Sequence, residues 1–155
     1  MTDEAKKDFT MRITQANKSG LVVILYEMYL TYLEDAMNAA DNRREFREGI
    51  RKARGCINEL MNSLDFDYEL SYNLLQLYVY VNKEMARADV RGQKEPLQVC
   101  HKIMKGLMEA YRQVSVRDTS GPVMENAQEV YAGLTYGKGK LTESMTHQRN
   151  RGFLA

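Results

Sequence analysis

Hydrophobic side chains recur every three or four residues in three long segments of the chain, residues 46–64, 70–88 and 97–114. This spacing places them on one face of an α-helix, and no segment of comparable length alternates as a strand would. The three rows are Phe46, Ile50, Ala53, Ile57, Leu60 and Leu64; Leu70, Leu74, Leu77, Val81, Met85 and Ala88; and Leu97, Cys100, Met104, Leu107, Tyr111 and Val114. The pattern predicts three amphipathic helices that share one core.

A further helix is predicted ahead of these, from about residue 19 to residue 40, with an apolar arc wide enough for two rows. The rows are Leu21, Leu25, Met28 and Tyr32, and Val22, Tyr26, Tyr29 and Leu33. Polar residues suited to N-caps precede the first three helices, and a proline suits the first turn of the last helix. The candidates are Asn17 or Ser19, Asp41 or Asn42, Asp65 or Asp67, and Pro96.

Short connections between the four segments require consecutive helices to run antiparallel. We therefore predict an all-α fold, an antiparallel up-down four-helix bundle over residues 19–117. Residues 1–18 are expected to form an N-terminal cap segment. Residues 118–155 hold five of the ten glycines and form a C-terminal extension. A short helix from Pro122 through Tyr131 can form there, and we expect the extension to dock on the bundle or to stay partly flexible.

Length and charge narrow the class of protein. The 155 residues suit one domain, and 22 Lys and Arg against 21 Asp and Glu leave a net charge of +1, which gives no support for nucleic-acid or membrane-surface binding. The N-terminus lacks the apolar core of a secretory signal, and the longest apolar run, Leu21 to Tyr26, is far shorter than the roughly 20 residues that span a bilayer. With Cys56 and Cys100 as free thiols, these features predict a cytoplasmic protein without membrane insertion.

No arrangement of residues points to catalysis or to a metal site. The sequence has no Glu-x-x-His, and its cysteines and histidines lack the paired spacing of zinc ligands. With two histidines, no nucleophile–base pair can be argued. A basic cluster in the second predicted helix is interleaved with glutamates, which favours a solvated face over nucleic-acid binding. We therefore predict no enzymatic activity, cofactor or metal. The residues considered were Cys56, Cys100, His101 and His147, and Arg43, Arg44, Arg47, Arg51, Lys52 and Arg54.

Small and apolar residues beside the core rows indicate a surface for an amphipathic partner helix. An interior glycine costs a helix about 1 kcal/mol relative to alanine, and close approach of another backbone is one reason to keep it. Ten methionines would help such a surface adapt. The small residues could equally let the bundle's own helices pack closely, and both interpretations remain open at this point. The candidates are Gly49, Ala53 and Cys56; Leu75, Tyr78 and Val79; and Val99, Ile103, Gly106 and Ala110.

Several fragments together resemble the flagellar secretion chaperones of the FliS type. They lie in the family's order and at its separations, across about residues 9–117. The fragments are Ile24-Leu25-Tyr26-Glu27 in the first helix, Lys52-Ala53-Arg54 with Ile57-Asn58-Glu59-Leu60 and Leu64-Asp65 in the second, and Leu77-Tyr78-Val79-Tyr80-Val81 with Ala86 to Asp89 in the third. A typical member ends near Val116, so the extension departs from the family's pattern.

The resemblance implies a cytosolic export chaperone without enzymatic activity. Members of the family bind the disordered C-terminal segment of flagellin, which folds into helices on the chaperone. Binding prevents premature polymerisation and assists delivery to the flagellar type III export apparatus, whose export gate is a second expected partner. In the family, the segment ahead of the first helix, here Phe9 to Lys18, can fold over the empty site. The alternative function is a helical-bundle adaptor or regulatory module for another protein.

Overall fold

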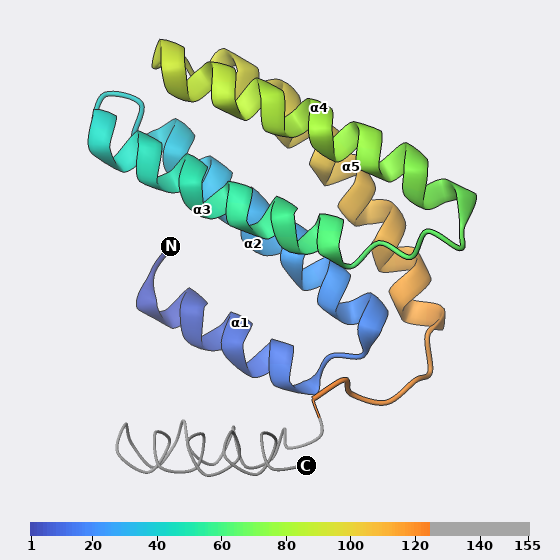
Figure 1. Ribbon diagram of the computed structural model, residues 1–155. Coiled ribbons are helices and arrows are strands. Elements are labelled where there is room, and N and C mark those ends of the chain that lie inside the picture. Colours follow the sequence, from blue (N-terminus) through green and yellow to red (C-terminus); the bar gives the residue numbers. More distant parts are fainter. Residues whose placement is uncertain (125–155) are drawn as a thin grey trace, which may run out of the picture.

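The structure is a computed structural model that describes residues 1–124 (Figure 1). These residues form helices joined by short connections, and no strand occurs among them. The five helices are α1 (Asp3–Gln15), α2 (Lys18–Asn38), α3 (Arg43–Asn62), α4 (Glu69–Arg91) and α5 (Glu95–Arg117). The predicted all-α class is confirmed.

Four of the helices, α2 to α5, form the up-down bundle, in which each runs antiparallel to the next (Figure 1). α2 packs against α3 and α5, and α4 packs against the same two helices. The N-terminal cap segment contains one helix, α1, which packs against α2 on the outside of the bundle. Most of the expected C-terminal extension, including nearly all of its proposed short helix, lies outside the described residues.

The wide apolar arc of α2 follows from its position, because α1, α3 and α5 contact it from three sides. Tyr26, Tyr29 and Leu33 of one predicted row are fully buried in the core. The other row, Leu21, Leu25, Met28 and Tyr32, is half-buried. α2 is therefore the central element of the molecule.

The core of α3 is the predicted one, whereas the buried face of α4 is rotated by one residue in its first half, with Ser71 and Tyr78 in place of Leu70 and Leu77. The other residues of the predicted row, Leu74, Val81, Met85 and Ala88, are buried as predicted. Tyr78 is only 1% exposed, while Leu70 is 62% exposed. The rotation has a physical reason: the Tyr78 ring fills the interior and its hydroxyl finds a buried partner, the Tyr26 hydroxyl, 2.5 Å away. The buried row of α4 is Ser71, Leu74, Tyr78, Val81, Met85 and Ala88. In α5, Leu97, Cys100 and Met104 are buried as predicted, Met108 joins them, and Val114 is exposed.

Most predicted helix starts are also found. The side chains of Asn17 and Asn42 accept hydrogen bonds from N–H groups in the first turns of α2 and α3. Pro96 lies in the first turn of α5. The prediction for α4 is wrong, because its N-cap is Tyr68 and no side chain caps it. The Asp65 carboxylate instead accepts from the Asp67 N–H in the loop, and its backbone carbonyl accepts from the Ser71 hydroxyl in the first turn of α4.

Candidate partner-binding site

The structure divides the ten predicted partner-binding residues among three environments. Four of them, Gly49, Ala53, Cys56 and Tyr78, are buried in the bundle. Leu75 is half-buried and Val79 is exposed, both on α4. The remaining four lie on α5, where Ile103 is half-buried and the others are exposed; they are Val99, Ile103, Gly106 and Ala110. The ten therefore do not line one continuous surface.

The three candidate residues of α3, Gly49, Ala53 and Cys56, are buried and pack within the bundle itself. A Cβ atom added at Gly49 would lie 2.7 Å from the Cβ of Ala36 and 3.0 Å from its backbone. Gly49 is thus a glycine because α2 and α3 approach each other closely at this point. Of the two interpretations left open by the sequence, internal packing applies to this helix.

Gly106 of α5 gives the opposite result. A Cβ atom built there would meet nothing within 4 Å. No packing contact among the described residues therefore explains why this helix position lacks a side chain, although glycine weakens a helix by about 1 kcal/mol relative to alanine. Gly106 therefore stays a predicted partner-binding residue.

The other residues near Gly106 make one flank of α5 apolar. His101 lies 2.8 Å from Glu34, and Arg112 donates to Glu27 at 2.9 Å, so this flank of α5 faces α2. Helical geometry places Ile103 and Ala110 on the opposite flank, towards α4. Asp89 of α4 pairs with Arg47 of α3, so the flank of α4 that carries Asp89 faces α3. Leu70 and Leu77 lie on the other flank of α4, which therefore points towards α5. We call these facing residues the α4–α5 surface: Leu70, Leu77, Val99, Ile103, Gly106, Ala110 and Val114.

The α4–α5 surface ends in an apolar pocket at one end of the bundle. The pocket has a volume of about 390 Å³ and lies between the start of α2, the α3–α4 loop and the end of α5. Leu70 and Val114, which are both exposed, lie on its rim. Both residues belong to predicted core rows, so the sequence does not predict the pocket. Both lie near helix ends, beyond the reach of the neighbouring helices, and this position was the available sign that they are exposed.

A cluster of tyrosines underlies the pocket. The rings of Tyr26 and Tyr111 have centroids 5.5 Å apart, and those of Tyr26 and Tyr78 are 6.4 Å apart. Burial raises the pKa of Tyr78 to about 12 and that of Tyr26 further still, so all these hydroxyls are neutral at ordinary pH. Tyr78 and Tyr111 line the pocket, which therefore has neutral aromatic walls, with Lys18, Asp65 and Asp118 as its charged lining residues.

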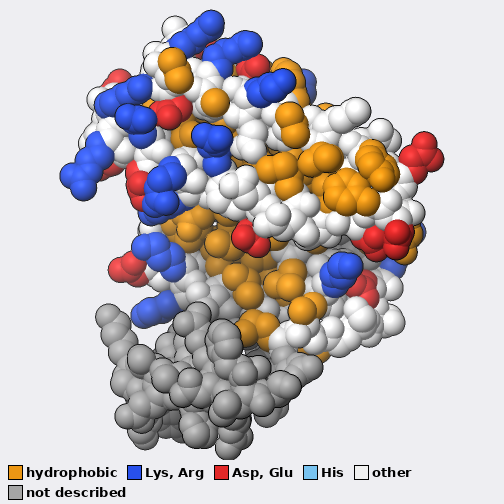
Figure 2. Space-filling model, viewed as in Figure 1, with side chains coloured by type: hydrophobic (Ala, Val, Ile, Leu, Met, Phe, Trp, Pro, Cys, Tyr) orange, Lys and Arg blue, Asp and Glu red, His pale blue; other side chains and the backbone are white. Residues whose placement is uncertain are grey.

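Hydrophobic side chains are also exposed on the other flank of α4. The rings of Phe66 and Tyr72 are in tilted contact, with centroids 5.1 Å apart and an interplanar angle of 54°. Leu75 and Val79 lie on the flank towards α3. Figure 2 shows hydrophobic side chains gathered where α3 ends and α4 begins, and others in the hollow between α3 and α1. Apolar surface thus extends along both flanks of α4.

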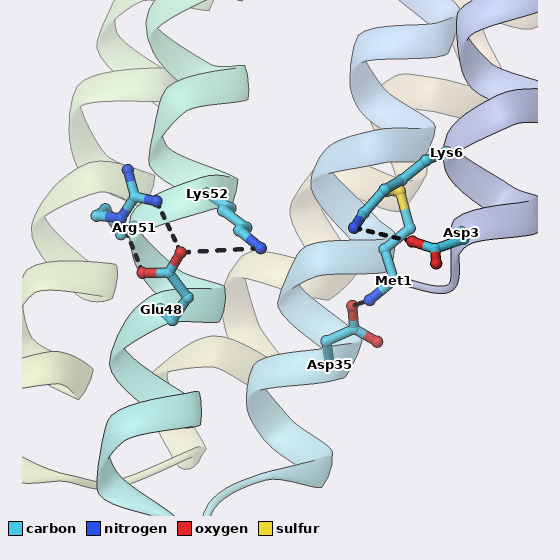
Figure 3. Close-up of polar contacts among 7 residues, drawn as sticks. All are labelled: Met1, Asp3, Lys6, Asp35, Glu48, Arg51 and Lys52. Atoms are coloured by element: carbon cyan, nitrogen blue, oxygen red, sulfur yellow. Dashed lines mark hydrogen bonds and ion pairs between the residues drawn. The ribbon is translucent and has the colours of Figure 1, made fainter. Parts of the chain in front are cut away.

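α1 is held against α2 by charges at both of its ends. The amino group of Met1 points to the carboxylate of Asp35 on α2 (Figure 3). Arg12 lies 2.6 Å from Glu27, which also accepts from Arg112 of α5. Among the described residues, α1 packs on α2 and not on α4 or α5. It therefore leaves the α4–α5 surface open.

The segment that follows α5 is bonded to the α1–α2 connection. The Asn17 side-chain amide donates to the carbonyls of Asp118 (3.2 Å) and Ser120 (3.3 Å), and the Ser19 hydroxyl donates to the Asp118 carboxylate. The Val123 N–H donates to the Ala16 carbonyl at 3.0 Å. Hydrogen bonds from Ser120 and Ser19 lower the pKa of Asp118 to about 2. These contacts fix the two ends of the bundle sequence to each other.

Other kinds of site find little support in the described part of the chain. Within residues 1–124, no three His, Cys, Asp or Glu side chains gather as metal ligands would. Cys56 and Cys100 are buried, and burial raises their pKa values to about 11 and about 12, which leaves both thiols protonated. No helix there is long and apolar enough to cross a membrane.

A helical bundle with exposed apolar surface and an apolar pocket at one end is typical of a protein that binds other proteins. The comparison with protein-family models agrees with this class. The model of the flagellar protein FliS matches residues 1–118, so the chain belongs to the FliS family of flagellar export chaperones, which is not a family of enzymes. The match ends where α5 ends. The search among curated proteins found no match.

Proposed function

We propose that the protein is a cytosolic chaperone for flagellin: it binds flagellin's disordered C-terminal segment, prevents premature polymerisation and assists delivery to the flagellar type III export apparatus. The observation that carries the proposal is the match to the FliS family across the whole bundle. The export gate would then be a second partner. The open α4–α5 surface with its apolar pocket supports the proposal, because an amphipathic helix can lie along it.

The energetics favour an extended surface over a single pocket. Ordering a disordered segment costs about 2–5 kcal/mol, and fully burying one Leu or Val side chain contributes about 1.5–3 kcal/mol. At least two or three anchors must therefore be buried before binding becomes favourable. The exposed members of the α4–α5 surface supply this number: Leu70, Leu77, Val99 and Val114.

Titration with a peptide of flagellin's C-terminal helices tests the proposal. We expect binding in the micromolar range or tighter, and no binding by the folded protein would overturn it. Gly106→Leu places a side chain on the α4–α5 surface and should weaken binding about tenfold or more by blocking close approach. Gly55→Leu on α3 is the matched control, because Gly55 is also exposed with nothing within 4 Å of its Cβ position.

A second pair of variants separates the pocket from general surface hydrophobicity. Val114 lies on the rim of the pocket, whereas Val116 is 85% exposed and lies outside it. Val114→Asp should therefore reduce peptide affinity, and Val116→Asp should leave it unchanged. Equal effects of the two substitutions would show that the peptide does not use the pocket.

The role of α1 can be tested in the same assay. The resemblance to the family implies that residues 9–18 cover part of the empty site, and here α1 covers one side of α2. Phe9, 8% exposed, is the most buried hydrophobic residue of α1. If flagellin also uses the covered side of α2, Phe9→Asp should loosen α1 and raise peptide affinity. Unchanged affinity would restrict the flagellin site to the surface that is already open.

A further inference from the structure

The outward face of α3 carries a group of arginines that the flagellin site does not use. Arg43, Arg44, Arg47, Arg51 and Arg54 are all exposed and line a hollow of about 1160 Å³, together with Glu48 and Asp89. Figure 2 shows Lys and Arg side chains gathered over the end of the molecule where α3 begins. Five arginines against two carboxylates give this face an excess of positive charge, although the chain as a whole is almost neutral.

The two carboxylates in the hollow are already engaged. Arg51 donates to both oxygens of Glu48, at 2.7 and 2.9 Å, and the Lys52 ammonium lies 3.8 Å from the same carboxylate (Figure 3). Arg47 donates to Asp89 at 3.0 Å. The carboxylate of Glu48 is accordingly stabilised, and its pKa is lowered. Among residues 1–124, Arg43, Arg44 and Arg54 have no ion-pair partner.

A glycine also lines this charged hollow. Gly55 is in the interior of α3, is exposed and has nothing within 4 Å of its Cβ position. Alanine there would strengthen the helix by about 1 kcal/mol. Unlike Gly49, the position is not required for packing within the bundle, so its missing side chain leaves room for another backbone to approach α3 beside Arg54.

The charge and shape of the hollow select the class of partner. Guanidinium groups bind carboxylates through two parallel hydrogen bonds, and the three unpaired arginines are spread over about three helical turns, or roughly 17 Å. This length and the bare position at Gly55 suit a helix with acidic residues on one face. A nucleic-acid backbone, with its regular row of phosphates, would meet the carboxylates of Glu48 and Asp89 in the same hollow.

We propose that this face of α3 is a second docking surface, which binds an acidic α-helix of a partner protein independently of the flagellin site. The carboxylates of the partner pair with Arg43, Arg44 and Arg54, and its backbone passes over Gly55. Because the arginines are exposed, the interaction is dominated by screened charges and depends strongly on salt.

The probe for this surface is a fluorescein-labelled helical peptide with glutamates four residues apart on one face, measured by fluorescence anisotropy with the full chain. We expect binding at about 50 mM salt that weakens about tenfold or more at about 300 mM. The same peptide with glutamine in place of glutamate should not bind. Arg44→Glu with Arg54→Glu should abolish binding, whereas Lys102→Glu with Lys105→Glu on α5, which changes the net charge equally, should not.

Gly55→Leu tests the close approach separately from the charge. This substitution should block the acidic peptide and leave the flagellin peptide unaffected, and Gly106→Leu should do the reverse. Circular dichroism would verify that each variant is folded, as expected when glycine is replaced in an exposed helix.

Several results would overturn the second surface without touching the proposal for flagellin. They are equal binding of the glutamine peptide, unchanged binding after the two arginine substitutions, and tighter binding of a single-stranded oligonucleotide of similar length than of the acidic peptide. Loss of flagellin-peptide affinity in the arginine variant would instead show that this face belongs to the flagellin site. Failure of the flagellin peptide alone would leave the second surface standing.

Discussion

Two glycine-to-alanine substitutions separate a residue of the bundle interior from one of the binding surface. Alanine gains about 1 kcal/mol over glycine at either helix position from propensity alone. At Gly49, the new methyl group would lie 2.7 Å from the Ala36 Cβ and 3.0 Å from backbone atoms, which cannot rotate away. Such overpacking costs about 1–3 kcal/mol. At Gly106 nothing lies within 4 Å, so the gain is kept.

We therefore expect Gly106→Ala to raise the free energy of unfolding by about 1 kcal/mol. The free energy of unfolding of Gly49→Ala should be about 1–3 kcal/mol lower than that of Gly106→Ala. Urea denaturation of both variants at pH 7, followed by circular dichroism, measures this difference. Gly55→Ala is the control and should behave as Gly106→Ala does. Equal stability of Gly49→Ala and Gly106→Ala would refute the assignment of Gly49 to the α2–α3 contact, and with it the division of the predicted site.

Three further predictions concern buried and paired groups. Tyr78→Phe leaves the Tyr26 hydroxyl buried without a partner and should lower the free energy of unfolding by about 1–3 kcal/mol in urea denaturation. Adding Tyr26→Phe should recover part of this loss, and a double variant whose cost is the sum of the two single costs would contradict the prediction. The Asp118 pKa of about 2 lies below its ordinary value of 3.8, so the carboxylate stabilises the fold above pH 3.8 and this contribution disappears as the pH falls towards 2. The difference in Tm between the protein and Asp118→Asn should accordingly shrink in acid, and a constant difference would argue against the bonds to Ser19 and Ser120. Both cysteine thiols should react with Ellman's reagent at pH 8 only after unfolding, and rapid labelling of the folded protein would contradict their burial.

The sequence predicts the bundle because its core rows are long and regular. Every residue from Phe46 to Leu60 in the α3 row is buried as expected. The prediction is wrong at two positions of α4, Leu70 and Leu77, because apolar residues occur on more than one side of this helix and spacing alone admits two faces. The choice between Leu77 and Tyr78 depends on a hydroxyl partner, Tyr26, which lies 52 residues away in the chain. No local pattern contains that information.

The candidate site could be predicted only in part, for a related reason. Gly49, Gly55 and Gly106 look alike in the sequence, since each interrupts a helix that otherwise has good propensity. What distinguishes them is the neighbour across the helix: Ala36 for Gly49, and open space for the other two. The predicted surface therefore combined residues of an internal packing contact with exposed residues. The exposed residues of α5 remain candidates. The pocket was not predicted, because it forms where the start of α2, the α3–α4 loop and the end of α5 meet.

The position of α2 explains how the bundle can offer separate surfaces. Because α2 supplies buried contacts to α1, α3 and α5, the outward faces of α3 and α5 are not needed to hold the fold together. Each can then keep a glycine that costs stability without a compensating contact inside the bundle. If both glycines were merely tolerated, leucine at either position would affect no partner. If each marks a surface, Gly55→Leu and Gly106→Leu must each abolish a different interaction, and it is this reciprocal loss that distinguishes two docking surfaces from one.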